Sequence, residues 1–112
     1  MMVNPSKAKG TKFETACADY FRSAGFSECY RMADGGEHDA GDLGGLPQVA
    51  AECRDRARLD LAGNVADANR RAIEKKVPFG VTIMKKRGAS IADAYVACDL
   101  ETFTRILHAL NG

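Results

Sequence analysis

Residues 31–58, RMADGGEHDAGDLGGLPQVAAECRDRAR, combine a glycine-rich turn with a short apolar run that ends in charged residues. The run 49–51, Val-Ala-Ala, leads directly into Glu52, Cys53 and Arg54. Because side chains alternate along a strand, Glu52 and Arg54 would lie on one face and Cys53 on the other. The sequence therefore predicts a strand over 49–54 that carries a carboxylate and a cation side by side.

Two aspartates of the glycine-rich turn, Asp39 and Asp42, could bring a second carboxylate to Glu52. We favour Asp42 because it precedes Leu43, where a strand can begin, whereas an aspartate among glycines most often hydrogen-bonds the loop backbone. Two carboxylates can share a hard divalent ion such as Mg²⁺, which takes oxygen ligands and keeps several waters. Such an ion activates water and stabilises charge on a phosphate, so the pattern favours phosphodiester hydrolysis. The single loop histidine, His38, is weak evidence for a general base.

The apolar pattern around this stretch predicts an α/β protein. Apolar residues at helical spacing predict three amphipathic helices, over 11–24, 60–76 and 100–110. Runs of β-formers predict further strands at 28–32, 79–84 and 94–98, beside one beginning at Leu43 and the strand 49–54. Residues 33–45 would be mostly loop and tight turn. The order of helix, three strands, helix, two strands and helix predicts a mixed central sheet flanked by helices.

The length of 112 residues fits one domain, and we expect a basic N-terminal arm over 1–10 followed by a single domain over 11–112. The net charge of +1 gives no strong attraction to nucleic acid, but basic residues are clustered. The clusters are Lys7, Lys9 and Lys12, then Arg54, Arg56 and Arg58, and finally Lys85, Lys86 and Arg87. A solvated surface explains any one of these clusters equally well.

The four cysteines are Cys17, Cys29, Cys53 and Cys98. They form no CxxC pair and have no nearby histidine at zinc-ligand spacing, so they are typical of small buried residues in a reduced cytosolic protein. No apolar run is long enough to span a bilayer. We therefore expect a soluble protein of the cytoplasm.

The turn and the strand together resemble a known family. Gly41-Asp42-Leu43, followed by Glu52-Cys53-Arg54, resembles the signature of the PD-(D/E)xK nucleases, in which an aspartate precedes an apolar strand that ends in Glu-x-Lys. The chain looks most like the small Holliday junction resolvases of archaea and the resolvase-like nucleases of actinobacteriophages. Those chains also open with a helix that carries an early glutamate, matched here by Glu14. The resemblance covers about residues 10–107, and the family lysine is Arg54 in this sequence.

The resemblance implies a restriction-endonuclease-like core and a metal-dependent endonuclease that acts on branched DNA such as a Holliday junction. It implies that Glu14, Asp42 and Glu52 hold one or two Mg²⁺ or Mn²⁺ ions against the scissile phosphate. Arg54 would keep the charge of the family lysine and could grip a phosphate with two hydrogen bonds, but it cannot give up a proton. The resemblance also implies a homodimer, and a location in the host cytoplasm if the protein is encoded by a phage. The expected phosphate contacts are Lys7, Lys9, Arg56, Lys85, Lys86 and Arg87.

Other interpretations of the same residues stay open. Glu14 could be an ordinary acidic residue near the positive end of a helix dipole. With Arg54 in place of lysine, the chain could be a weakened nuclease fold that binds DNA with little catalysis. It could also be a small α/β interaction protein in which Glu52 and Arg54 form only a surface ion pair.

Overall fold

Two parallel strands, β3 (Val49–Arg54) and β4 (Phe79–Met84), form the centre of the fold. In this computed structural model the backbone is described for residues 5–32 and 41–112, and the side chains for residues 10–32 and 42–112. The two strands pair along their whole length, from Val49 opposite Phe79 to Arg54 opposite Met84. Nearly all of their residues are buried, as is usual for parallel strands covered on both faces. Both strands have the bounds that the sequence predicts.

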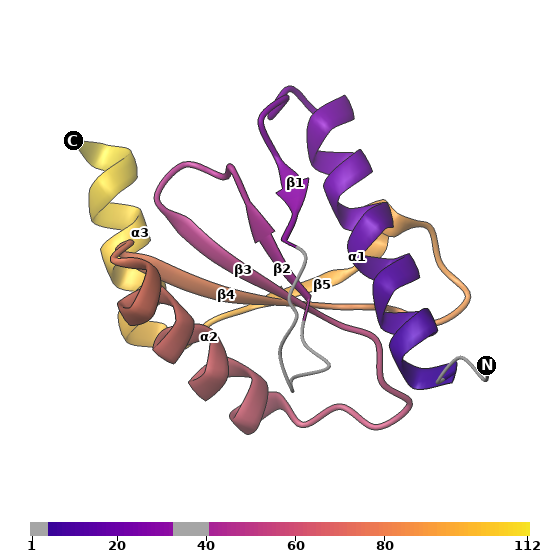
Figure 1. Cartoon of the computed structure of the whole chain (residues 1–112). Helices are drawn as coiled ribbons and strands as arrows, with labels where there is room; N and C mark the ends of the chain where they lie inside the picture. Colours follow the sequence, from indigo (N-terminus) through magenta and orange to yellow (C-terminus); the bar gives the residue numbers. More distant parts are fainter. Residues whose placement is uncertain (1–4, 33–40) are drawn as a thin grey trace.

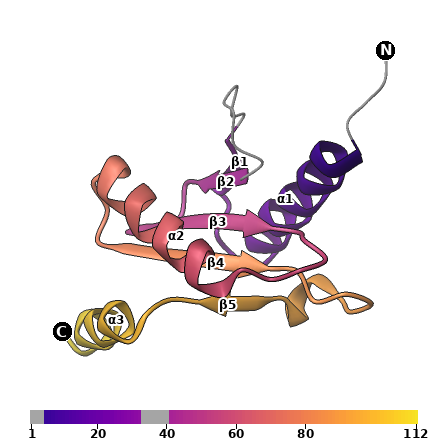
Figure 2. The same ribbon diagram turned by 90° about the horizontal axis from the view of Figure 1, so that it is seen from below.

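Three antiparallel strands complete a five-stranded mixed sheet. They are β1 (Tyr30–Arg31), β2 (Gly41–Gly44) and β5 (Tyr95–Ala97). The order across the sheet is β1-β2-β3-β4-β5, which Figure 2 shows with β5 at the edge away from β1. The predicted α/β fold with a mixed sheet is therefore confirmed. β1 and β5 are shorter than expected, and β2 already begins at Gly41, inside the predicted turn. Residues 33–40 of that turn, with His38 and Asp39, lie outside the described residues.

In the described part of the chain, three α-helices flank the sheet. They are α1 (Pro5–Ser23), α2 (Leu61–Lys75) and α3 (Leu100–Asn111), with a short 3-10 helix, η1 (Ile91–Asp93), before β5. Asp60 caps α2 by accepting a hydrogen bond from the Gly63 N–H, and Asp99 caps α3 by accepting one from the Thr102 N–H. α1 begins at Pro5, so the expected arm over 1–10 is wrong for residues 5–10. Proline suits the first turn of a helix because its missing N–H has no partner there.

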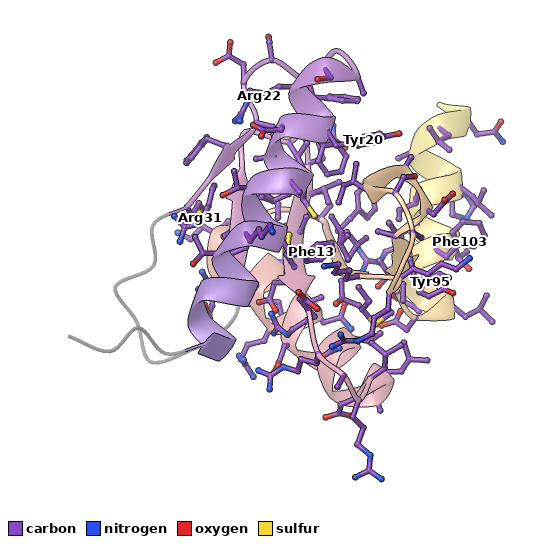
Figure 3. The ribbon with its side chains drawn as sticks, turned by 90° about the vertical axis from the view of Figure 1, so that its right-hand side faces the viewer. Phe13, Tyr20, Arg22, Arg31, Tyr95 and Phe103 are labelled. Atoms are coloured by element: carbon purple, nitrogen blue, oxygen red, sulfur yellow. The ribbon has the colours of Figure 1, made fainter. Side chains whose placement is uncertain are left out.

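The helices α1 and α2 cover opposite faces of the sheet (Figure 1). Under α1, Phe13 and Cys17 pack in one core cluster with Leu43, Ala51 and Cys53. Figure 3 shows Phe13 directed from α1 towards the sheet. Because neighbouring residues of a strand alternate, the even-numbered residues of β3 face the other way, towards α2.

α2 lies unusually close to β4. A Cβ atom added at Gly80 would be only 2.2 Å from the carbonyl oxygen of Ala68 on α2. Ala68 and Ala72 are buried along this contact, and their small side chains let the helix approach the sheet. Among the described residues, no helix has both the length and the apolar character needed to cross a bilayer.

The cysteines do not form disulfides. Cys17, Cys29 and Cys53 are buried and Cys98 is half-buried, as expected for small core residues. A hydrogen bond with Cys17, together with burial, raises the pKa of the Cys53 thiol. Burial also raises the pKa of the Cys29 thiol.

Candidate functional site

Asp42 on β2 lies directly opposite Glu52 on β3. Both side chains are nearly fully enclosed, with 1% and 2% of their surface exposed, on the face that α2 covers. Side chains directly opposite each other on antiparallel strands have Cβ atoms about 4.5–5.5 Å apart. The structure therefore brings together the two carboxylates that the sequence pattern pairs.

Arg54 lies on the same face of β3 as Glu52. Its Nη2 atom is 2.6 Å from Glu52 Oε2 and 3.3 Å from Asp67 Oδ2 of α2. The Glu52–Arg54 pair is buried, so the interpretation of a surface ion pair is wrong in that respect. Burial raises the pKa of Glu52, because the loss of hydration outweighs the opposing attraction of Arg54.

Two cations of α2 contact the same carboxylates. Arg71 donates from Nη2 to Asp42 Oδ2, and its Nε lies 3.7 Å from Glu52 Oε1. Lys75 Nζ lies 3.6 Å from Asp42 Oδ2. Burial lowers the pKa of Lys75, and the nearby charge of Arg71 lowers it further. Asp42 and Glu52 are thus held together by one shared guanidinium, with an ammonium beside it.

The residues of α2 were not predicted as site residues. Asp67, Arg71 and Lys75 follow one another at four-residue spacing, which places them on one face of a helix. That spacing is visible in the sequence beside the apolar stripe of Ala68 and Ala72. The stripe predicts which side of α2 is buried, but it does not show which strands lie beneath the helix.

Glu14 is elsewhere. It is buried on α1 and accepts a hydrogen bond from Arg31 Nε at 3.2 Å. Arg31, which Figure 3 shows beside α1, lies opposite Leu43 of the α1-side core. Glu14 is therefore on the face opposite to Asp42 and Glu52, and the expected cluster of three carboxylates is wrong. In the described ranges, no three acidic, histidine or cysteine side chains gather closely enough to hold a metal ion.

The remaining pair still offers oxygen atoms suited to Mg²⁺ or Mn²⁺. Thr82 of β4 is paired with Glu52 on the side of β3 away from Asp42. Asp42, Glu52 and Thr82 therefore form one row across three strands. Asp42 Oδ1 and Thr82 Oγ1 are both buried without a hydrogen-bond partner among the described residues. Mg²⁺ is usually bound through one or two carboxylates, waters and substrate phosphates. Two carboxylates with an unsatisfied buried oxygen fit that requirement.

Metal binding at this pair requires Arg71 to release Asp42. An alternative partner is already in place, because Arg71 Nη1 lies 2.9 Å from Glu74 Oε2 on the same helix. Glu74 is about half exposed. Arg71 can therefore turn towards solvent without losing all of its ionic partners.

The expected DNA contacts that the structure describes lie near the C-terminal ends of β3 and β4. Arg56, Lys85, Lys86 and Arg87 are exposed there, and Lys85 Nζ is 3.7 Å from Asp55 Oδ2. The side chains of Lys7 and Lys9 lie outside the described residues.

Comparison of the chain with protein-family models, curated proteins and solved structures found no match.

Proposed function

We propose that the protein is a metal-dependent endonuclease that cleaves branched DNA, in the manner of a Holliday junction resolvase. The observation that carries this proposal is the buried cross-strand pair of Asp42 and Glu52. Burying two adjacent carboxylates is costly, and ionisable groups in such surroundings are concentrated at functional sites. The raised pKa of Glu52 fits that description.

The order of the strands supports the same proposal. An antiparallel unit of β1, β2 and β3 is followed by α2 and then by β4 parallel to β3. This is the arrangement expected of the restriction-endonuclease-like core that the sequence resembles. A fold alone does not establish an activity, so the buried carboxylate pair carries the proposal.

Asp42 and Glu52 would hold Mg²⁺ or Mn²⁺, without Glu14. When bound, the metal supplies an activated water and neutralises charge on the phosphate. Arg54 stabilises the anionic phosphate by charge and hydrogen bonding, but it cannot take or give a proton. Lys75, whose Nζ is 3.6 Å from Asp42, contributes the ammonium group that position 54 lacks.

The proposed substrate is branched DNA, contacted through its phosphates by the exposed basic residues near the ends of β3 and β4. A four-way junction presents two related strands, so we also propose that the protein acts as a homodimer. We propose the cytoplasm as its location. The apolar residues that α3 exposes supply the dimer surface. They are Leu100, Phe103, Leu107 and Leu110.

The proposal is tested by cleavage of a labelled four-way junction with Mg²⁺ or Mn²⁺. We expect the wild type to cut, and Asp42→Asn and Glu52→Ala to lose the activity. Glu101→Ala, which removes an exposed carboxylate of α3, is the matched control and should cut normally. Equal cleavage by the wild type and Glu52→Ala would end the proposal.

A second candidate function is DNA binding by a catalytically weakened nuclease fold. It is favoured by Arg54 in the place of the family lysine and by the ion pairs that Arg71 makes with both carboxylates. Salt-sensitive junction binding without cleavage would support this alternative. Failure to bind any DNA at low salt would instead support an interaction protein.

A further inference from the structure

A small groove with a basic rim lies between α1 and the segment that follows β4. Its volume is about 170 Å³. Lys12, Lys85 and Lys86 form the exposed rim, and Phe13, Ile91 and Ala94 form the more buried apolar floor. We call this feature the basic groove. None of the described residues that line it is acidic.

The rim favours an anionic ligand. Three lysines from two separate segments, α1 and the loop after β4, line one opening. Asp55, near this rim, is paired with Lys85 at 3.7 Å, and Asp93 accepts a hydrogen bond at 3.3 Å from the hydroxyl of Ser90, which lines the groove. Both carboxylates offset part of the positive charge. Clustered positive charge around a concave surface raises the local concentration of anions.

The floor and the size narrow the choice of ligand. Pockets for drug-sized molecules have volumes of about 300–1,000 Å³, so this groove is suited to a smaller group. A bare phosphate gains nothing from an apolar floor. A nucleotide has both parts, because its phosphates match the lysines and its base matches the apolar floor.

The position of the groove connects it to the candidate site. The Lys85 N–H donates to the Arg54 carbonyl oxygen at 3.0 Å, so one wall of the groove is joined to the end of β3. Bases within a duplex are stacked and paired, and extruding one costs energy, whereas the unpaired base of a single strand, a gap or a flap is already available. A fully paired four-way junction offers such a base only where a pair at the crossover opens.

We propose that the basic groove binds one unpaired nucleotide of single-stranded or branched DNA, with its phosphates on the lysines and its base against Ile91 and Ala94. This inference rests on the proposed function in taking DNA as the ligand. It adds a basis on which the protein distinguishes DNA with unpaired bases from fully paired duplex DNA.

The test is the affinity of the full chain for fluorescein-labelled oligothymidylate and for a duplex of equal length, measured by anisotropy without divalent metal. Ala94→Leu fills the groove without changing charge, and we expect it to weaken single-strand binding about tenfold while duplex binding is unchanged. Lys85→Ala with Lys86→Ala should weaken both and lower the single-strand salt slope by about 1.4.

Lys76→Asn is the control for the loss of a single positive charge away from the groove, because Lys76 precedes β4 at the opposite end of the sheet. Asparagine also tolerates the left-handed backbone that Lys76 adopts, with φ of 58°. We expect this variant to bind oligothymidylate as the wild type does. Thermal melting verifies the fold of each variant. If Ala94→Leu has a much lower melting temperature than the wild type, Ala89→Leu, which also lies in the groove lining, replaces it.

Unchanged single-strand affinity in a folded, groove-filled variant would overturn the inference, as would wild-type protein that does not bind oligothymidylate. Displacement of the oligonucleotide by oligoglutamate of equal charge would assign the groove to acidic peptides and would also overturn it. If any of these three results is found and junction cleavage still depends on Glu52, the proposed nuclease function stays intact. Loss of base binding and loss of catalysis are thus separate outcomes.

Discussion

The guanidinium of Arg54 lies 2.6 Å from the carboxylate of Glu52 on a buried face of β3. Under the proposed function, this arginine stands where the nucleases that the sequence resembles carry lysine. Because a guanidinium stays protonated, Arg54 provides charge without proton transfer. This pair makes the activity of the site testable by one substitution.

We predict that Arg54→Lys raises junction cleavage. A lysine keeps the charge beside Glu52 and restores a group that can orient water, and groups that assist proton transfer typically contribute 10²–10⁴-fold. We expect a gain of at least about tenfold, measured as single-turnover cleavage with Mn²⁺. Arg54→Met is the control, and it should instead destabilise the fold by about 3–5 kcal/mol because Glu52 loses its nearest ion-pair partner and keeps only Arg71 at 3.7 Å among the described residues. Retained junction binding without cleavage in Arg54→Lys would favour the DNA-binding alternative.

Arg71→Gln should loosen the site and improve metal binding. The change removes the guanidinium shared by Asp42 and Glu52, so we expect tighter Mn²⁺ binding by calorimetry. We also expect a loss of about 2 kcal/mol of unfolding free energy, since hydrogen bonds to charged groups contribute about 1.5–3 kcal/mol.

The neighbouring substitution Arg70→Gln is the control for that prediction. Arg70 is 57% exposed and pairs only with Asp67 and Glu74 among the described residues. Exposed ion pairs contribute about 0–1 kcal/mol, so the stability should change little and Mn²⁺ affinity not at all. Equal effects of the two substitutions would show that Arg71 does not restrain the carboxylates.

Gly80→Ala should separate α2 from the sheet. The added Cβ would be 2.2 Å from the Ala68 carbonyl oxygen, which belongs to helix backbone and cannot rotate away. We expect a loss of about 3 kcal/mol in urea unfolding. Gly88→Ala is the control, because its Cβ meets nothing within 4 Å and only its φ of +72° opposes alanine. That strain costs about 1 kcal/mol, so a larger effect at Gly88 than at Gly80 would contradict the prediction.

The cap of α3 should make stability depend on pH in the acid range. Hydrogen bonds from the Thr102 N–H and the Asn69 side chain hold the pKa of Asp99 below its usual value. The unfolded chain therefore binds this proton more readily than the folded one, so the stabilisation is present above about pH 3.8 and is lost as the pH falls.

Asp99→Asn isolates this contribution, because asparagine can still cap the helix but does not titrate. Urea unfolding of both proteins between about pH 3 and pH 7 should show a steeper acid loss in the wild type than in the variant. Parallel curves for the two proteins would show that Asp99 does not carry the effect.

The exposed apolar residues of α3 should make the protein a dimer. Leu110 is 81% exposed and Leu100 is 80% exposed, and large apolar patches on a surface mark interaction sites. Light scattering after gel filtration should give the mass of two chains for the wild type and of one chain for Leu110→Glu. His108→Glu adds the same charge to α3 at another exposed position and should stay dimeric. A monomeric wild type would contradict the prediction.

The sequence by itself determined most of the secondary structure. Strands 49–54 and 79–84 and the helices after residues 60 and 99 follow from local periodicity, because alternation and helical spacing act over only a few residues. The shared face of Glu52 and Arg54 follows from the same alternation. The apolar residue Leu43 indicated the start of a strand and so favoured its neighbour Asp42 as the partner of Glu52. Asp42 and Glu52 do lie opposite each other.

Only the tertiary structure decided which groups surround those carboxylates. A shift of one residue in strand register reverses every side chain, so the placement of Asp42 opposite Glu52 depends on how β2 pairs with β3. The same packing puts Glu14 beneath α1 on the far face and brings Arg71 and Lys75 over the near one. These contacts join residues 17 to 33 positions apart in the chain, beyond the reach of local periodicity.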